Sequence, residues 1–241
     1  MRGGLGDEVF HREDDRFRDA GRPLTAARDA EAVVEAIDTL TKSHAGRIEA
    51  GAFAGPHAIL KARRRLAVGA VLADPRAVPA VTLVLRHSRA DVRHWTMHAK
   101  GWSAIRPGLK RIYAHGRDAL EAAEAPTADN FHELRKSAKH LGYAVEFLRA
   151  TRPGALGQLA KRLKEMAQAL GDARDLALLR RTIEATPDTF AAPGAVLAAL
   201  ADRRRMELES AALVLGQRIY RRKPKAFVRK IERYWHDWRN G

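Results

Sequence analysis

The stretch FHELRKSAKHLGYAVEFL, residues 131–148, decides the fold of this chain. At about 100° per residue its side chains sort into two stripes on nearly opposite faces of one helix. One stripe is apolar and consists of Phe131, Leu134, Ala138, Leu141, Val145 and Leu148. The other consists of His132, Arg135, Lys136, Lys139, His140 and Tyr143, with only Glu146 among them. Ordinary solvated faces mix acids among their bases, so this pattern predicts a helix that packs by one face and binds an anion by the other.

A solvated basic face is the commoner interpretation for a single helix, but a second segment repeats the arrangement. In IRPGLKRIYAHGRDAL, residues 105–120, four side chains follow one line at i, i+4, i+7 and i+11, with an apolar line beside them. The four are Arg106, Lys110, Tyr113 and Arg117, and no acid lies among them. Two neighbouring helices of this kind predict a basic wall over a common core, which suits a long polyanion.

The rest of the chain also reads as helical. Ala, Leu, Arg and Glu dominate, and alternating runs of β-branched residues are absent, so we expect an all-α protein. RAVPAVTLVLRH, residues 76–87, has strand-like propensity but sits between helical patterns, and we assign it to a helix. Helices are predicted at 5–24, 28–44, 56–74, 76–98, 101–124, 128–150, 154–170, 172–185, 194–221 and 224–239, with breaks at the Gly and Pro clusters.

An internal repeat relates the two parts of the chain. Ala27-Arg28-Asp29-Ala30 and Ala173-Arg174-Asp175-Leu176 stand 146 residues apart, and other positions match at the same offset. We place each Arg-Asp pair between two helices, where the aspartate would cap the second helix. For Arg28 and Arg174, a structural role and a role in ligand binding stay equally open.

Composition limits the function. The chain has 241 residues, enough for one sizeable helical domain, and its 44 Lys and Arg against 29 acids leave a net charge of +15. This excess favours nucleic acid, an anionic membrane or polyphosphate as partner. There are no cysteines, no signal-peptide core and no 18-residue apolar run, so we expect a soluble cytoplasmic protein without disulfides or membrane spans.

These residues carry a family resemblance. HELRKSAKHLGY, residues 132–143, matches the HxxRKxxKxxxY pattern of the CHAD domain, the conserved-histidine α-helical domain, and LGDARDLALL at 170–179 resembles its LGDxxDLAVL element. GLKRIYAHGR and RIYRRKPKAFVRKIERYW are also similar to family segments. The resemblance implies a single domain over 1–241, built of two pseudo-symmetric antiparallel helical-bundle halves with a basic cavity between them. It also implies binding of inorganic polyphosphate, with localisation on polyphosphate granules as a further expectation.

A polyphosphate site needs closely spaced cations. Arginine forks onto two phosphate oxygens, lysine acts as a mobile charge, and histidine adds a pH-sensitive donor. The bases around Pro224, among them Arg218 and Lys223, are expected to form the rim of the cavity. The candidate binding residues are therefore His132, Arg135, Lys136, Lys139, Tyr143, Arg106, Lys110, Tyr113, Arg117, Arg28, Arg174, Arg218 and Lys223.

An enzyme is the main rival class. CHAD domains are often joined to a triphosphate-tunnel metalloenzyme domain whose signature resembles ExExK, but the nearest match here, Glu207-Leu-Glu209, is followed by Ala211 in place of lysine. No phosphate-binding loop, HExxH or GxSxG motif occurs. Asp91, His94 and His98 could share a helix face as metal ligands, which we regard as incidental. We expect no catalysis, no cofactor and no metal.

Two non-enzymatic alternatives remain. Nucleic acid would draw on the same bases, although aromatic residues are few and no known DNA- or RNA-binding signature is present. An accessory or scaffold protein of phosphate metabolism is the other, but it would not need basic stripes free of acids.

The repeat also makes a prediction about the start of the chain. At an offset of 146, the counterpart of the 132–148 helix falls at positions −14 to 2, so only Met1 and Arg2 remain of it. The N-terminal half, 1–98, therefore should lack its first motif helix, while the C-terminal half, 99–241, should be complete. We expect the apolar faces of Phe10, Phe17, Val33 and Ile37 to be partly uncovered. The first half is then predicted to be less well ordered, or covered by a neighbouring chain in a homodimer.

Overall fold

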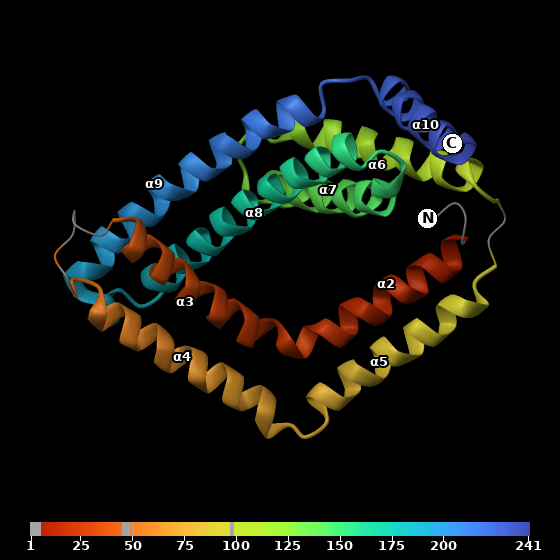
Figure 1. The fold of residues 1–241 in the computed structure, drawn as a ribbon. Coiled ribbons are helices and arrows are strands. Elements are labelled where there is room, and N and C mark those ends of the chain that lie inside the picture. Colours follow the sequence, from red (N-terminus) through yellow and green to blue (C-terminus); the bar gives the residue numbers. More distant parts are fainter. Residues whose placement is uncertain (1–5, 45–48, 50, 97–98) are drawn as a thin grey trace. The chain divides into compact units, whose positions relative to one another are not determined.

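The computed structural model describes residues 6–44, 49, 51–96 and 99–241 (Figure 1). Every regular element in these ranges is helical, so the predicted all-α class is confirmed for this part of the chain. The α-helices are α2 (Asp7–Gly21), α3 (Thr25–Ser43), α4 (Ala54–Ala73), α5 (Ala77–Asp91), α6 (Trp102–Ala122), α7 (Ala128–Phe147), α8 (Pro153–Glu184), α9 (Pro187–Ile219) and α10 (Pro224–Asn240). The short 3-10 helices are η1 (Arg22–Leu24), η2 (Val92–His94) and η3 (Arg149–Thr151).

Most predicted helix limits fall within a few residues of the observed ones, but the break predicted at 171 is wrong. Helix α8 runs without interruption from Pro153 to Glu184. A single interior glycine costs a helix about 1 kcal/mol relative to alanine. Leu170, Ala173 and Leu176, which flank Gly171, are buried, and this packing carries the helix through it. The predicted ends at residues 5 and 98 lie outside the described residues.

Prolines and one backbone break shape the other helices. The segment around Pro79 is helical, as predicted, within α5. Helix α9 is interrupted at Ala191, whose φ of 49° and ψ of −153° are not helical, and a short turn from Pro187 precedes the break. Pro224 opens α10 after the extended Lys223, which confirms the predicted bend between the last two helices.

The chain divides into two compact units, and each is described by itself. Unit 1 contains Gly6, residues 99–174 and residues 206–241; unit 2 contains the described residues of 7–96 together with 175–205. The core of unit 1 takes apolar side chains from α6, α7, α10 and the parts of α8 and α9 that belong to it, and its fully buried members include Leu134, Leu141 and Met166. These helices position the α7 bases discussed below.

In unit 2, the apolar side chains that were predicted to be partly uncovered differ in their exposure. Phe10 and Phe17 of α2 are 37% and 48% exposed, as predicted, whereas Val33 and Ile37 of α3 are buried, so that part of the prediction is wrong. Both lie on the α3 face that packs in the core, with Val34, Ala36 and Leu40.

The predicted capping roles of the two aspartates are wrong. Helix α3 begins at Thr25, with Leu24 as its N-cap, so Asp29 lies one turn inside the helix. Asp175 lies in the middle of the uninterrupted α8. Neither residue sits at the first free backbone N–H groups, which a cap would satisfy.

Among the helices of the described residues, none alone is long and apolar enough to cross a membrane; Ala54–Ala73 and Ala77–His94 pass that test only as a pair, bent by 68°.

Candidate anion-binding site

Helix α7 is fixed firmly at its start. The side chain of Thr127, the N-cap, accepts a hydrogen bond from the backbone N–H of Asn130 at 3.2 Å. The side-chain amide of Asn130 donates to the carbonyl oxygens of Ala122 at 2.8 Å and Ala125 at 2.9 Å, which ties α7 to the end of α6. Caps of this kind stabilise a helix by about 1 kcal/mol. The basic face of α7 therefore has a defined orientation in unit 1.

The predicted basic stripe lies along the outer face of α7, opposite the core. We call His132, Arg135, Lys136, Lys139 and Tyr143 the α7 row. His132, Lys136 and Tyr143 are exposed, and Arg135 and Lys139 are half-buried. Within the described residues, Arg135 and Lys139 form no ion pair with an acid. Two adjacent turns of the helix thus carry cations whose charge is not neutralised by a neighbour.

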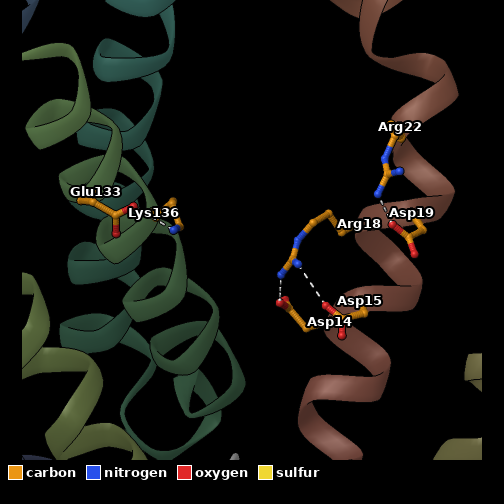
Figure 2. Close-up of polar contacts among 7 residues, drawn as sticks. All are labelled: Asp14, Asp15, Arg18, Asp19, Arg22, Glu133 and Lys136. Atoms are coloured by element: carbon orange, nitrogen blue, oxygen red, sulfur yellow. Dashed lines mark hydrogen bonds and ion pairs between the residues drawn. The ribbon is translucent and has the colours of Figure 1, made fainter.

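Lys136 is the exception in the row. Its Nζ lies 2.8 Å from Oε1 of Glu133, one turn earlier on α7 (Figure 2). The ammonium lowers the pKa of Glu133. Both side chains are about half exposed, so the pair is weak and can exchange for a ligand.

The arginines around the end of α2 illustrate the contrasting pattern. Arg18 pairs with Asp14 and Asp15 on α2, and Arg22, the first residue of η1, pairs with Asp19 of α2 (Figure 2). Such local pairing is what a solvated, neutralised helix face has. Arg135 and Lys139 of the α7 row do not have it.

Arg135 lies against helix α8 at Gly171. A Cβ atom placed on Gly171 would be 3.2 Å from Nε and 3.4 Å from Nη2 of Arg135. The Nε atom is buried and has no hydrogen-bond partner among the residues that the structure describes. The guanidinium is therefore held by packing between α7 and α8, and an acid does not hold it.

The other edge of α7 meets α6. Nδ1 of His115 on α6 lies 2.9 Å from Oγ of the buried Ser137. His140 follows Ser137 by one turn, and its pKa is lowered, first by desolvation of the ring and then by the positive charges of Lys136, His115 and Lys139. In the free protein this histidine therefore stays neutral to lower pH than usual.

The α6 row, defined as Arg106, Lys110 and Arg117, has a different neighbour. Arg106 and Lys110 are exposed. Nη1 of Arg117 donates to the carbonyl oxygens of Tyr220 at 2.7 Å and Arg222 at 2.8 Å. These carbonyls follow the end of α9, where a cation is favoured. Arg117 therefore fastens α6 to the bend between α9 and α10.

Tyr113, predicted to bind the ligand, is a core residue. Its side chain is fully buried and its hydroxyl donates to the carbonyl of Ile219 at 3.1 Å and accepts from the backbone N–H of Arg222 at 3.2 Å. Burial raises the pKa of this phenol. The prediction is corrected, because a buried and hydrogen-bonded hydroxyl cannot contact a polymer at the surface. Tyr113 follows Arg106 by seven residues, so its side chain points in a slightly different direction around α6, and that direction leads into the core.

The two rows do not form one wall, contrary to the sequence prediction. His115 and Arg117 are two residues apart on α6 and so point about 160° away from each other. His115 faces α7, and Arg117 faces the bend before α10. The α6 row therefore lies on the edge of α6 that is turned away from the α7 row. Unit 1 carries two separate basic surfaces.

The remaining predicted bases are spread over the chain. Arg218, near the end of α9, and Lys223, at the bend, are exposed close to the carbonyls that Arg117 contacts, so they extend the α6 row. Arg174 is half-buried on α8, one turn beyond Gly171. Arg28 is exposed on α3 in unit 2.

Sequence reasoning missed two residues that contact α7, namely His115 and Gly171. Two contacts set the register of α7 on α8: Arg135 against Gly171, and Gly142 against Leu163, whose Cβ would lie 3.7 Å from a Cβ on the glycine. The predicted helix break at residue 171 concealed the role of Gly171, because a glycine between two helices would not face α7.

Asp91, one of the three residues considered as metal ligands in the sequence, has an arginine partner. Asp91 Oδ2 lies 2.8 Å from Nη1 of Arg16, which lowers the pKa of the carboxyl. His98 lies outside the described residues. Within the described parts, no group of three potential metal ligands occurs.

The described residues form an all-helical protein, and its helix α7 carries a row of bases in which Arg135 and Lys139 have no acidic partner. In comparison with protein families, residues 1–184 match the CHAD domain, which is three quarters of the chain. The chain therefore belongs to the CHAD domain family. The match includes the α7 row and the segment at 170–179, whereas Arg218 and Lys223 lie beyond it. No curated protein and no solved structure matched the chain.

Proposed function

We propose that this protein binds inorganic polyphosphate without catalysis, chiefly through the α7 row, and that binding targets it to polyphosphate granules in the cytoplasm. The supporting observation is that Arg135 and Lys139 lie on adjacent turns, partly shielded from water and not neutralised by an acid. Charge-assisted hydrogen bonds to phosphate contribute about 1.5–3 kcal/mol each. A repeating polyanion can meet several such cations in one pose.

The α6 row supplies a second basic surface for the same polymer. Arg106 and Lys110 are exposed there, and Arg218 and Lys223 lie near its end. The arrangement of two pseudo-symmetric halves around a basic cavity, which the family resemblance implies, remains a prediction, as do a homodimer and the absence of enzymatic activity.

Nucleic acid is the second candidate, for a specific reason. Tyr143 and Phe147 lie one turn apart on α7, 65% and 75% exposed, directly beside the bases. Exposed aromatic rings next to cations can stack bases of a single strand. Polyphosphate is favoured because the charges of the row are closely spaced and Tyr143 and Phe147 are the only two exposed aromatic side chains described on this helix.

A competition assay tests the proposal. Labelled long-chain polyphosphate is bound to the protein at physiological salt and displaced with duplex DNA, single-stranded RNA or ATP. We expect unlabelled polyphosphate to compete best, at equal concentration of charge, and the affinity to fall steeply with added salt as counterions are released. Equal or stronger competition by DNA or RNA would overturn the proposal in favour of nucleic acid.

A further inference from the structure

We propose that Gly171 is a positioning residue for anion binding, because its missing side chain leaves the place on α8 that the guanidinium of Arg135 occupies. This inference rests on the proposed function of the α7 row. The three atoms nearest to the position where a Cβ of Gly171 would stand all belong to that guanidinium group: Nε at 3.2 Å, Nη2 at 3.4 Å and Cζ at 3.7 Å. The side chain of Arg135 therefore lies on bare helix backbone.

The contact keeps the charge of Arg135 available. Nε is buried without an acceptor, and no carboxylate pairs with the guanidinium in the described part of the chain. An arginine is commonly held in place by an acid, which also neutralises it. Here the backbone of α8 confines the side chain and leaves its charge for a ligand, so less rotamer freedom is lost when phosphate binds.

Alanine at position 171 would disturb the contact between the α8 backbone and the guanidinium of Arg135. A contact of 3.2 Å is tighter than nearly all contacts of real Cβ atoms, so one of the two groups must move by a few tenths of an ångström. The arginine side chain is flexible and the α8 backbone is not, so the guanidinium moves. Alanine also favours the helix over glycine. The substitution should therefore weaken binding without destabilising the protein.

Gly157 provides a matched control on the same helix. A Cβ there would meet only Cδ of Arg149, at 4.0 Å, which is ordinary contact. Gly157→Ala gives α8 the same gain in helix propensity and leaves Arg135 untouched. It separates the effect on helix stability from the effect on the arginine.

The experiment measures affinity for long-chain polyphosphate and the urea midpoint of unfolding for Gly171→Ala, Gly157→Ala, Arg135→Gln and the Gly171→Ala/Arg135→Gln double variant. We expect Gly171→Ala to weaken binding about three- to ten-fold, on the scale of one charge-assisted contact, with an unchanged or higher urea midpoint. Gly157→Ala should bind like the unmodified protein. In the Arg135→Gln background, Gly171→Ala should have no further effect, because the group that it displaces is gone.

The possible failures are distinguishable. If Gly171→Ala binds normally while Arg135→Gln binds weakly, the positioning role is wrong and the proposed function stands. If Arg135→Gln also binds normally, the α7 row is not the polyphosphate site. If Gly171→Ala weakens binding equally with and without Arg135, the glycine acts through the helix and not through the arginine, which also overturns the inference.

Discussion

Phe227 of α10 stacks on Tyr113 of α6, with ring centroids 3.9 Å apart and planes only 9° from parallel. Tyr220, directly after the end of α9, lies against the same tyrosine at a centroid distance of 5.4 Å. Tyr113 thus joins three helices within the core of unit 1, and its hydroxyl fixes the backbone of the bend before α10.

Replacing Tyr113 with phenylalanine tests this assignment. Tyr113→Phe keeps the stacking but leaves the carbonyl of Ile219 and the N–H of Arg222 without their partner. We expect a loss of roughly 1–3 kcal/mol in the free energy of unfolding, measured by urea denaturation, because unsatisfied groups near the core lose hydrogen bonds. Polyphosphate affinity should not change. A large loss of affinity in a protein of normal stability would restore Tyr113 to the binding set.

Removing both unpaired cations of the α7 row should weaken binding strongly. Arg135→Gln combined with Lys139→Gln is expected to lower polyphosphate affinity at least about ten-fold, since each contact contributes roughly 1.5–3 kcal/mol. The fold should persist, which circular dichroism and urea denaturation can check. Arg229→Gln with Arg233→Gln, two exposed bases of α10, removes the same charge and is the control. Equal losses in the two double variants would mean that only net charge matters.

Removing the acid that pairs with Lys136 should strengthen binding. In Glu133→Gln, the ammonium no longer has to exchange a carboxylate for a phosphate, and one repelling charge is gone. Exposed ion pairs contribute at most about 1 kcal/mol, so the expected gain is up to about five-fold in affinity by calorimetric titration at low salt. Asp19→Asn, which removes the acid paired with Arg22, is a control away from the α7 row. The idea fails if both substitutions raise the affinity alike.

Binding should depend on pH through His140. Its pKa lies below its usual 6.5 in the free protein, and bound phosphate, by offsetting the charges of Lys136, Lys139 and His115, would raise it. A ligand that raises a pKa binds more tightly as pH falls through that range. We expect polyphosphate affinity to rise between about pH 8 and about pH 5.5, and His140→Gln to reduce that rise. An unchanged pH profile in His140→Gln would contradict this coupling.

The lowered pKa of His140 affects the stability of the free protein in the opposite direction: affinity rises as pH falls, whereas stability decreases. A histidine whose pKa is lower in the folded state than in the unfolded state takes up protons on unfolding. Its contribution to stability is therefore complete above the unfolded pKa near 6.5 and is lost as pH falls below it. Polyphosphate should therefore offset the loss of stability that His140 causes at acid pH.

The sequence predicted the helices and the α7 row well, because both depend on periodicity within one segment. The apolar stripe of α7 is buried from Phe131 to Leu148, as the 3.6-residue period requires. The α6 row was misjudged because residues at i, i+4 and i+7 do not point in quite the same direction from the helix axis. Of these residues, Tyr113 points closest to the core and is buried there. Whether His115 or Arg117 faces α7 depends on packing between helices, which a single segment does not encode.

Gly171 was misjudged for a related reason. A glycine in LGDARDLALL is a reasonable helix end by local propensity, since glycine commonly terminates helices. Burial of Leu170, Ala173 and Leu176 by other segments overrides that preference. The role of Gly171 then comes from the arginine opposite, 36 residues earlier in the sequence, and only the packing of α7 on α8 reveals it.

The hydrogen bonds from Arg117 to the bend after α9 affect when unit 1 can fold during synthesis. The carbonyls of Tyr220 and Arg222, and the Phe227 ring that stacks on Tyr113, lie in the last part of the chain, after residues 175–205 of the other unit. During synthesis Tyr113 and Arg117 of α6 leave the ribosome about a hundred residues before these partners. The core of unit 1 therefore closes only when translation is almost complete, and a nascent chain that stops at residue 184, although it holds the whole family match, leaves Tyr113 without its stacking partner.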